Sequence, residues 1–382
     1  MPEVYIIAAV RTPIGIGKPE KGALSSIAPV ELAAHVLQHV VSRAGIEPGR
    51  VEDVILGCVT PIGDQGANIA RLASLQAGFP IDVPGLQLNR MCGSGQQAVH
   101  FASQVILAGD MDLIIAGGIE MMSHQAIGAD WPTEWPANFP YDLVHQGISA
   151  ELMAEKWNLE REALDDFAYE SHLRAGAAIR EGRQRSQIAP VHVPNGDGST
   201  HIVEEDQGVR MRPDREKMST LPPAFKQDGV ITAGNSSQIS DGAAALLVAS
   251  DKAVKEHDLT PLARVVAREI VGTDPVLMLD GPIPATRKVL QRAGLSLDKI
   301  DVIEINEAFA SVVLAWHKEI EADMAIVNPN GGAIAHGHPL GATGAVLMTK
   351  LVHELQQNGG RYGLQTMCIG HGMATATILE RM

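Results

Sequence analysis

The sequence predicts an α/β protein in which one α/β unit occurs twice, with a further subdomain inserted between the two occurrences. Three observations carry this prediction: apolar strand-like segments alternate with segments of helical periodicity, much of that order recurs later in the 382 residues, and a segment of different composition separates the two occurrences. Strands that are apolar throughout are typical of a mainly parallel sheet covered by helices on both faces.

The first unit begins with a buried-strand pattern at Val4–Val10. From Pro29 to Ala44 apolar residues recur at helical spacing, and Gly45 ends that helix. The predicted elements that follow are a strand at 51–57, a helix at 68–77, a strand that ends at Cys92, a helix directly after it, and a strand at 111–117.

The second unit repeats this order. The segment 43–55 is echoed by 292–303, and Gly93-Ser-Gly before a helix and a strand is paralleled by Gly341-Ala-Thr-Gly before a helix and a strand. Several similar segments in the same order indicate a duplicated unit. We therefore predict one domain over 1–252 and a second over 260–382.

The segment from about 121 to 238 differs from both units and is too long for a loop, so we expect an inserted subdomain that could lie over a site. It contains three of the four tryptophans and charged helices at 150–157 and 161–181. Arg210, Arg212, Arg215 and Lys217 form a basic cluster in it. Such a cluster is more often a solvated face, but it would also suit the phosphates of a ligand.

Composition excludes several classes of protein. The net charge of −15 argues against non-specific binding to nucleic acid or to anionic membranes. Three cysteines fit a reducing compartment and no disulfide framework. No signal peptide and no membrane span is expected, which predicts a cytoplasmic protein.

Cys92 is the first candidate for chemistry. An extended run ends at this cysteine, and Gly93 and Gly95 open the next helix. The free N–H groups and the dipole at a helix N-terminus favour the thiolate, which predicts a nucleophile. The alternative is a buried thiol that only fills space.

Three further candidates lie in the second unit. Asn306 and Glu307 follow an apolar strand at 301–305, His338 lies in the glycine-rich segment 328–344, and Cys368 ends a strand in a tight turn. α/β sheets bind ligands at the carboxyl ends of their strands. The alternatives are a helix cap, a satisfied loop histidine and a core thiol. We expect no metal site of the three cysteines and nearby histidines, on the premise that neither a CxxC nor an HxxxH pair of metal ligands is present.

At these residues the sequence resembles the thiolase family over essentially its whole length. The motifs that carry the resemblance are Cys92–Gly95, Thr232–Ala243, Asn306–Ala310, Gly331–Gly344 and Cys368–Gly370. The resemblance implies the duplicated five-layered α-β-α-β-α thiolase fold with an inserted loop subdomain. It also implies acyl-CoA and coenzyme A as substrates, no tightly bound cofactor, and a homodimer or homotetramer.

The resemblance further implies roles for single residues. Cys92 corresponds to the nucleophile that accepts the acyl group, His338 to its activating base and Cys368 to a second acid and base. Asn306, through a water, and His338 would hold an enolate oxygen, and the N–H groups of Cys92 and Gly370 would hold a tetrahedral oxyanion. For coenzyme A, Arg210 matches a phosphate contact, Ser237 a pantetheine contact and Phe309 the aromatic wall of the pantetheine tunnel.

Two departures from the family pattern concern the acyl group. His371 and Ala374 stand where glycine is usual, so His371 could crowd the acyl end or perturb the pKa of a thiol. His145 lies in a loop that resembles the one closing the acyl pocket of short-chain thiolases, but Gln146 replaces the usual methionine. Met278 matches a pocket methionine of that class.

The leading hypothesis is a degradative 3-ketoacyl-CoA thiolase (acetyl-CoA C-acyltransferase) that releases acetyl-CoA from a longer acyl chain. The nearest alternative is a short-chain acetyl-CoA acetyltransferase that joins two acetyl-CoA molecules. A decarboxylating ketosynthase needs no second thiol, so Cys368 argues against it. A catalytically silent CoA-binding or lipid-binding relative is the alternative from a different class.

Overall fold

The computed structural model describes residues 3–382, and its strands follow one hydrogen-bonded path, β4-β3-β5-β8-β1-β9-β12-β11-β10, with the short β2 beside β8. The strands are β1 (Val4–Arg11), β2 (Gly15–Ile16), β3 (Asp53–Gly57), β4 (Gly85–Leu88), β5 (Leu113–Met121), β8 (Ser240–Ser250), β9 (Ala263–Gly272), β10 (Val302–Ile305), β11 (Tyr362–Ile369) and β12 (Met373–Arg381). Strands β6 (Val191–Pro194) and β7 (Thr200–Val203) form a separate hairpin.

This path consists of two copies of one strand order. β4-β3-β5-β8-β1 corresponds to Val327-β10-β11-β12-β9, in which Val327 makes a parallel bridge to Ile303 in place of a full strand. β1 and β9 join the copies through only two residue pairs, Tyr5 with Arg264 and Ile6 with Ala263.

The prediction of a mainly parallel sheet is wrong, because each copy is mixed. β3 pairs in parallel with β4 and β5, and β10 pairs in parallel with β11. β8 and β12, however, run antiparallel to both of their neighbours. A parallel pair of strands needs a crossover connection, usually a helix, between its members. No such helix directly precedes β8 or β12.

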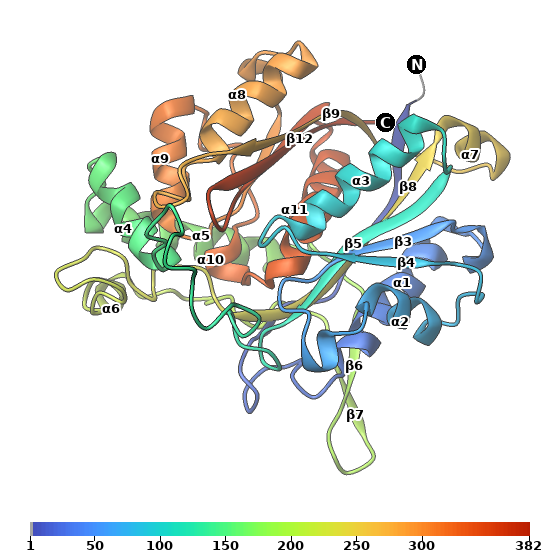
Figure 1. Ribbon diagram of the computed structural model, residues 1–382, viewed down its shortest axis with the longest axis horizontal. Helices are drawn as coiled ribbons and strands as arrows, with labels where there is room; N and C mark the ends of the chain where they lie inside the picture. The colour runs from blue at the N-terminus through green and yellow to red at the C-terminus, as the bar shows by residue number, and fades with distance from the viewer. Residues whose placement is uncertain (1–2) are drawn as a thin grey trace.

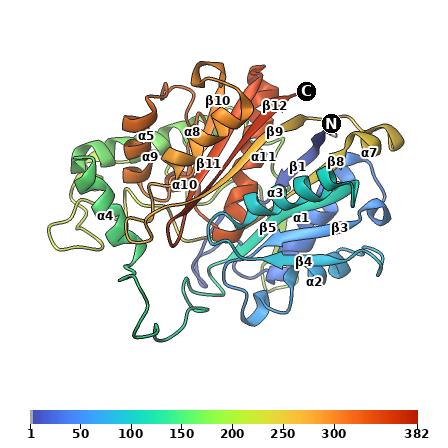
Figure 2. The ribbon, with the colours of Figure 1, turned by 45° about the horizontal axis from the view of Figure 1, so that its top comes forward.

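The helices form three layers around the two sheets. They are α1 (Pro29–Ala44), α2 (Ile69–Gln76), α3 (Ser94–Ala108), α4 (Gln146–Lys156), α5 (Arg161–Arg180), α6 (Arg215–Ser219), α7 (Asp251–Glu256), α8 (Pro282–Ala293), α9 (Ala310–Ile320), α10 (Ala333–His336) and α11 (Leu340–Asn358). α1 and α2 cover one sheet, α8 and α9 cover the other, and α3 and α11 lie between them (Figures 1 and 2).

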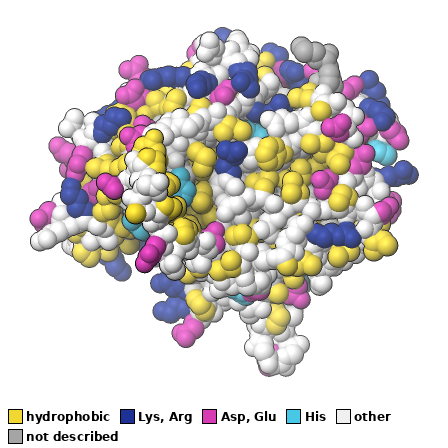
Figure 3. Space-filling view, in the orientation of Figure 1, with side chains coloured by type: hydrophobic (Ala, Val, Ile, Leu, Met, Phe, Trp, Pro, Cys, Tyr) yellow, Lys and Arg dark blue, Asp and Glu magenta, His cyan; other side chains and the backbone are white. Residues whose placement is uncertain are grey.

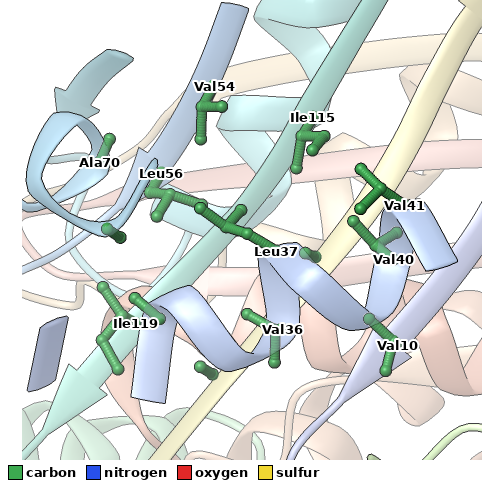
Figure 4. Close-up of a cluster of buried hydrophobic side chains, with 14 of the residues drawn as sticks. Val10, Val36, Leu37, Val40, Val41, Val54, Leu56, Ala70, Ile115 and Ile119 are labelled. Atoms are coloured by element: carbon green, nitrogen blue, oxygen red, sulfur yellow. The ribbon is translucent and has the colours of Figure 1, made fainter. Parts of the chain in front are cut away.

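Branched aliphatic side chains build the outer core of the first copy. Leu37 and Val40 on α1 pack against Leu56 and Ile115 on the sheet (Figure 4). Gly45, in the left-handed conformation at φ 68°, ends α1 where the sequence predicted. The apolar spacing of this helix therefore predicted both its limits and its buried face.

The two central helices cross closely because glycine occupies the crossing. A β-carbon on Gly95 of α3 would lie 2.8 Å from the backbone nitrogen of Ala345 and 2.9 Å from the carbonyl oxygen of Gly341, both on α11. The N-termini of α3 and α11 are thereby brought together, which places Cys92 and His338 in neighbouring loops.

The inserted segment packs at one end of the molecule. Met153 of α4 and Leu164 of α5 share a hydrophobic cluster with Ala310 and Val312 of α9. This cluster also contains Phe309 and Cys368, so the inserted segment contacts the loops that carry the candidate residues. Within the described residues, none of the helices combines the length and the apolar character that crossing a bilayer requires.

Candidate active site

Cys92 lies in a tight turn between β4 and α3. Met91, the residue before it, has a φ of 44°, in the left-handed region that non-glycine residues seldom adopt. Ser94 holds the turn: its hydroxyl accepts a hydrogen bond from the Arg90 N–H at 2.8 Å and donates one to the Met91 carbonyl at 2.6 Å. A strained residue beside a cysteine at a helix start is typical of a functional site.

The Cys92 sulfur is buried and surrounded by hydrogen-bond donors. Burial raises the pKa of this thiol to about 11, although hydrogen bonds from the backbone N–H groups of Gly370 and Cys92 itself act in the opposite direction. The expectation that the helix start favours the thiolate is therefore wrong for the free protein, because desolvation outweighs these donors. Cys92 is a thiol at neutral pH, and a nucleophilic role requires a base.

Cys368 lies next to Cys92 near the end of β11. Burial raises the pKa of this thiol, and the neighbouring Cys92 raises it further. Cys368 packs with Phe309 and Met278 in the cluster under the inserted segment. Two protonated thiols, carried by corresponding ends of the two copies, thus face one site.

His338 has one ring nitrogen fixed by a hydrogen bond and the other directed at Asn306. Nδ1 lies 2.6 Å from the Thr343 hydroxyl, and that hydroxyl donates its own proton to the Pro339 carbonyl at 2.8 Å. Nδ1 must then carry the proton and donate to Thr343, which leaves the lone pair on Nε2. Burial lowers the pKa of His338 to about 4, so the ring is neutral and can accept a proton at Nε2.

Asn306 follows β10 at the carboxyl end of the sheet, as the sequence predicted. Its N–H donates to the Thr366 carbonyl of β11 at 3.1 Å, and its Nδ2 lies 3.4 Å from Nε2 of His338. Asn306 is fully buried and His338 is only 5% exposed. The amide and the imidazole therefore form a fixed, buried polar pair.

A buried carboxylate ties this region to the first copy. Glu120, at the end of β5, accepts hydrogen bonds from the N–H groups of Val59 at 2.8 Å, Thr60 at 3.1 Å and Gly341 at 2.9 Å. Gly341 lies in the first turn of α11, three residues after His338. Glu120 thus fixes the start of α11 against the loop after β3.

A second buried carboxylate ties the site to the inserted segment. Glu307 accepts hydrogen bonds from the Ser171 hydroxyl of α5 at 2.7 Å, from Asn328 Nδ2 at 2.9 Å and from the Ile334 N–H at 3.2 Å. The loop that carries Asn306 is therefore held to α5 and to the glycine-rich segment before His338.

Residues 4–252 match the family model for the thiolase N-terminal domain, and residues 259–381 match the model for the thiolase C-terminal domain. The chain belongs to the thiolase family. The five-layered fold predicted from the sequence is confirmed by a solved structure, the acetyl-CoA acetyltransferase of Bacillus anthracis, with a TM-score of 0.92 and 39% identity over 100% of this chain and 99% of that one.

Curated relatives of this thiolase carry different names. A steroid 3-ketoacyl-CoA thiolase of Mycobacterium tuberculosis is 48% identical over 100% of this chain and 95% of its own length. A 3-oxoadipyl-CoA/3-oxo-5,6-dehydrosuberyl-CoA thiolase of Escherichia coli is 43% identical, with both chains fully covered. An acetyl-CoA acetyltransferase of Chromobacterium violaceum is 41% identical over 99% of this chain and 100% of its own. The shared chemistry is that of thiolases acting on acyl-CoA, whereas the acyl groups named differ.

Part of the predicted coenzyme A site of this thiolase lies together. The rings of His145, Phe225 and Phe309 form a row, the aromatic stack, that runs from the start of α4 to the start of α9. His145 and Phe225 are stacked with centroids 5.2 Å apart, and Phe225 meets Phe309 edge to face at 5.9 Å. Ser237 donates its N–H to the Ala308 carbonyl at 2.9 Å, beside this stack. Gln146, the first residue of α4, is partly buried next to His145.

The residues of the basic cluster of this thiolase have different surroundings. Arg215 forms ion pairs with Glu162 and Asp166, so much of its charge is compensated within the inserted segment. Arg210 remains exposed, and its guanidinium lies 3.0 Å from Nε2 of His172. Burial, followed by the charge of Arg210, lowers the pKa of His172 to about 3, so the ring is neutral. Its Nδ1 accepts a hydrogen bond from the backbone N–H of Arg210 at 3.1 Å, which orients this residue.

The two departures from the thiolase pattern have different consequences. Ala374 fits the ladder opposite Cys368 without disturbing it. His371 adopts a φ of 65°, in the region that favours glycine, and its ring packs against Trp131 and Trp135. Met278 also has a positive φ, of 61°, and is buried in the cluster that contains Cys368.

The sequence reasoning missed Thr343 and Glu120. Thr343 stands five residues after His338, inside the glycine-rich segment, but its partner could not be read from that spacing. Glu120 ends an apolar strand, which is the signal that identified Asn306, and the same rule would have found it.

The premise that the sequence has no HxxxH pair is wrong, because His35 and His39 on α1 have this spacing and their rings lie 4.4 Å apart. Across residues 3–382, no group of three or more His, Cys, Asp or Glu side chains is placed to hold a metal ion.

Proposed function

We propose that this thiolase cleaves 3-ketoacyl-CoA with coenzyme A, producing acetyl-CoA and a shortened acyl-CoA through an acyl group on Cys92. The observation that carries the proposal is the pairing of two buried thiols, Cys92 and Cys368, with the N–H groups of Cys92 and Gly370 directed at the Cys92 sulfur. This arrangement supplies a nucleophile, a second acid and base, and donors for an oxyanion.

In the first half-reaction His338 Nε2 takes the proton of the Cys92 thiol, and the sulfur attacks the ketone carbon. The N–H groups of Cys92 and Gly370 stabilise the tetrahedral oxyanion. The bond between C2 and C3 then breaks, leaving the acyl group on Cys92 and an acetyl-CoA enolate, whose oxygen His338 and a water on Asn306 hold. Cys368 donates the proton that C2 needs.

In the second half-reaction the Cys368 thiolate takes the proton of the incoming coenzyme A thiol. The coenzyme A sulfur attacks the thioester carbonyl, and Cys92 leaves and recovers its proton from His338. Both thiols return to their starting state, so the steps balance. Each thiol thereby has a task that the other cannot perform at the same moment.

For coenzyme A itself we propose a path along the aromatic stack to the thiols. Phe309 and His145 would line the pantetheine chain, Ser237 would contact it, and Arg210 would contact a phosphate. The exposure of Arg210 and its contact with His172 support this placement. We further propose a homodimer or homotetramer, which light scattering would measure.

A specific observation keeps a second candidate open, namely condensation of two acetyl-CoA molecules. The acetyl-CoA acetyltransferase of Bacillus anthracis has nearly the same fold, and Met278 is buried beside Cys368. Gln146 in place of methionine, and a 48% identical relative named for steroid 3-ketoacyl-CoA, favour cleavage of a larger substrate instead.

Thiolysis by the purified protein tests the proposal. Acetoacetyl-CoA and a long-chain 3-ketoacyl-CoA are compared by the loss of enolate absorbance on adding coenzyme A. We expect a higher kcat/KM for the longer substrate, and a loss of at least about 10³-fold for Cys92→Ser because a hydroxyl is a far poorer nucleophile. Faster turnover of acetoacetyl-CoA would favour the acetyltransferase, and no turnover of either would overturn the proposal.

A further inference from the structure

Resting on the proposed function, we propose that a groove beside His371 is the acyl subsite and that it takes a flat, fused-ring acyl group rather than a linear chain. The groove has a volume of about 390 Å³ and is lined mainly by Trp135, Phe139, Tyr141, Leu143, Pro275 and His371. A volume of this size is within the usual range for sites that bind a drug-sized molecule. An acetyl group would leave most of it unfilled.

The groove shares His371 with the loop that carries Gly370. His371 directly follows Gly370, whose N–H is bonded to the Cys92 sulfur. Thr273, which also lines the groove, donates its N–H to the Gly372 carbonyl at 2.7 Å. The segment then leads to Met278, which packs with Cys368. An acyl chain that starts at Cys92 and passes Gly370 therefore meets this groove.

The strained backbone conformation of His371 suggests that its side chain has a function. A φ of 65° strains the backbone of a residue with a β-carbon but not that of glycine. In return the imidazole packs against two indoles, with centroids 5.6 Å from Trp131 and 6.3 Å from Trp135. A glycine at this position would avoid the strain and remove one wall of the groove.

The shape and composition of the walls favour rings. Although the chain is only 4% aromatic, Trp131, Trp135, Phe139 and Tyr141 lie within one short segment. The rings of Trp135 and Phe139 are 5.2 Å apart, and Trp135 and Tyr141 remain 45% and 53% exposed. Rigid, flat side chains stack well on other flat rings and gain less from a flexible chain that must be ordered.

An exposed apolar surface of this kind is typical of a binding site. Hydrophobic side chains gather on the face shown in Figure 3, on the side where α4 and the adjoining loops lie in Figure 1. The lining of the groove contains no Lys, Arg, Asp or Glu. A neutral ring system therefore fits it better than an acyl group that ends in a carboxylate.

Two substrates with equal numbers of carbon atoms test the proposal: 3-oxo-4-(2-naphthyl)butanoyl-CoA, which carries a fused ring, and linear 3-oxotetradecanoyl-CoA. We expect kcat/KM to be about tenfold higher for the naphthyl substrate, and Trp135→Ala to reduce that ratio about tenfold. His371→Gly, which removes the strain and the ring together, should reduce the ratio too. As a matched control, Ile81→Ala alters an 84% exposed apolar side chain outside the groove and should leave the ratio unchanged.

A ratio near one, or a ratio that neither Trp135→Ala nor His371→Gly changes, would overturn the subsite and would make a second copy of the chain or another protein the better occupant. Turnover of acetoacetyl-CoA in that case would leave the proposed function standing. If no ketoacyl-CoA is cleaved, the proposed function fails. Calorimetric binding of the same two thioesters to the wild type and to Trp135→Ala then still decides the subsite.

Discussion

At the scale of single residues, the reactive state of this site is a neutral pair. The pKa of Cys92 is raised to about 11 and that of His338 is lowered to about 4, both mainly by burial. Between these values the thiol keeps its proton and the imidazole can accept it. In the proposed mechanism the proton moves only when the sulfur attacks, so charge would develop next to the N–H groups that stabilise it.

The first prediction concerns pH. Because His338 gains a proton only as the pH falls towards about 4, acetyl-CoA release in a single turnover without added coenzyme A should change less than about twofold between about pH 5.5 and 8. Rapid-quench kinetics at several pH values measure this. A rate that falls with an apparent pKa near the ordinary histidine value of about 6.5 would contradict it.

The second prediction concerns Thr343. Thr343→Val keeps the shape but removes the acceptor for His338 Nδ1, leaving a buried N–H without a partner, which costs about 1–3 kcal/mol. The ring can then turn or change tautomer, so kcat should fall about tenfold or more with little change in KM. Thr343→Ser restores the hydroxyl and should recover most of kcat. An unchanged kcat in Thr343→Val, or a loss that Thr343→Ser does not recover, would contradict the role of the hydrogen bond.

At the scale of elements, the crossing of α3 and α11 positions the site. Glycine at 95 permits the close approach, and Glu120 fixes the first turn of α11 through Gly341. The catalytic loops are held at the ends of β10 and β11, whose parallel register joins Ile305 to Thr366. The reacting groups are thus carried by rigid elements from both copies.

The third prediction compares two glycine-to-alanine changes in helices. In Gly95→Ala the new β-carbon would meet the backbone of α11, and the free energy of unfolding should fall by about 1–3 kcal/mol. In Gly176→Ala on α5 the nearest atom would be 3.4 Å away, at the end of the flexible Arg180 side chain, so alanine should stabilise by about 0.5–1 kcal/mol. Urea unfolding measures both, and a neutral Gly95→Ala would contradict the close crossing.

The helices and strands also show which parts of the fold can be predicted from the sequence. α1 and α5 were predicted nearly to the residue because their apolar spacing and glycine or charge signals coincide. Strands β8 and β12 were not predicted, and the antiparallel pairing that they add was missed, because an apolar strand has the same pattern in parallel and antiparallel sheets. Asn306 was found from its place after a strand, whereas Thr343 needed the three-dimensional path of the loop.

At the scale of the whole molecule, duplication explains why two cysteines share a site. Cys92 lies in the turn after β4, before the central helix of the first copy, while Cys368 lies on β11, the strand after the central helix of the second. Because the two central helices pack against each other, the carboxyl ends of both sheets meet at one place. The inserted segment then covers this place through α4, α5 and the aromatic stack.

The repeat could be recognised in the sequence because its similar segments occur in the same order. The family resemblance could be recognised from five motifs. The direction of the pKa shift of Cys92 could not be predicted from the sequence. A helix start lowers this pKa and burial raises it, and only the packing around the sulfur decides which effect is larger. The groove at His371 likewise depends on where the aromatic segment folds, although the unusual histidine was evident.

The most direct test of the central claim is intact-protein mass spectrometry after mixing the protein with 3-oxotetradecanoyl-CoA in the absence of coenzyme A. We predict release of acetyl-CoA together with a mass increase of one dodecanoyl group, located on Cys92 by peptide mapping. The adduct should persist in Cys58→Ser, whose thiol lies beside Glu120, and vanish in Cys92→Ser. An adduct on Cys368 or Cys58, or acetyl-CoA release with no adduct and unchanged turnover in Cys92→Ser, would contradict the account.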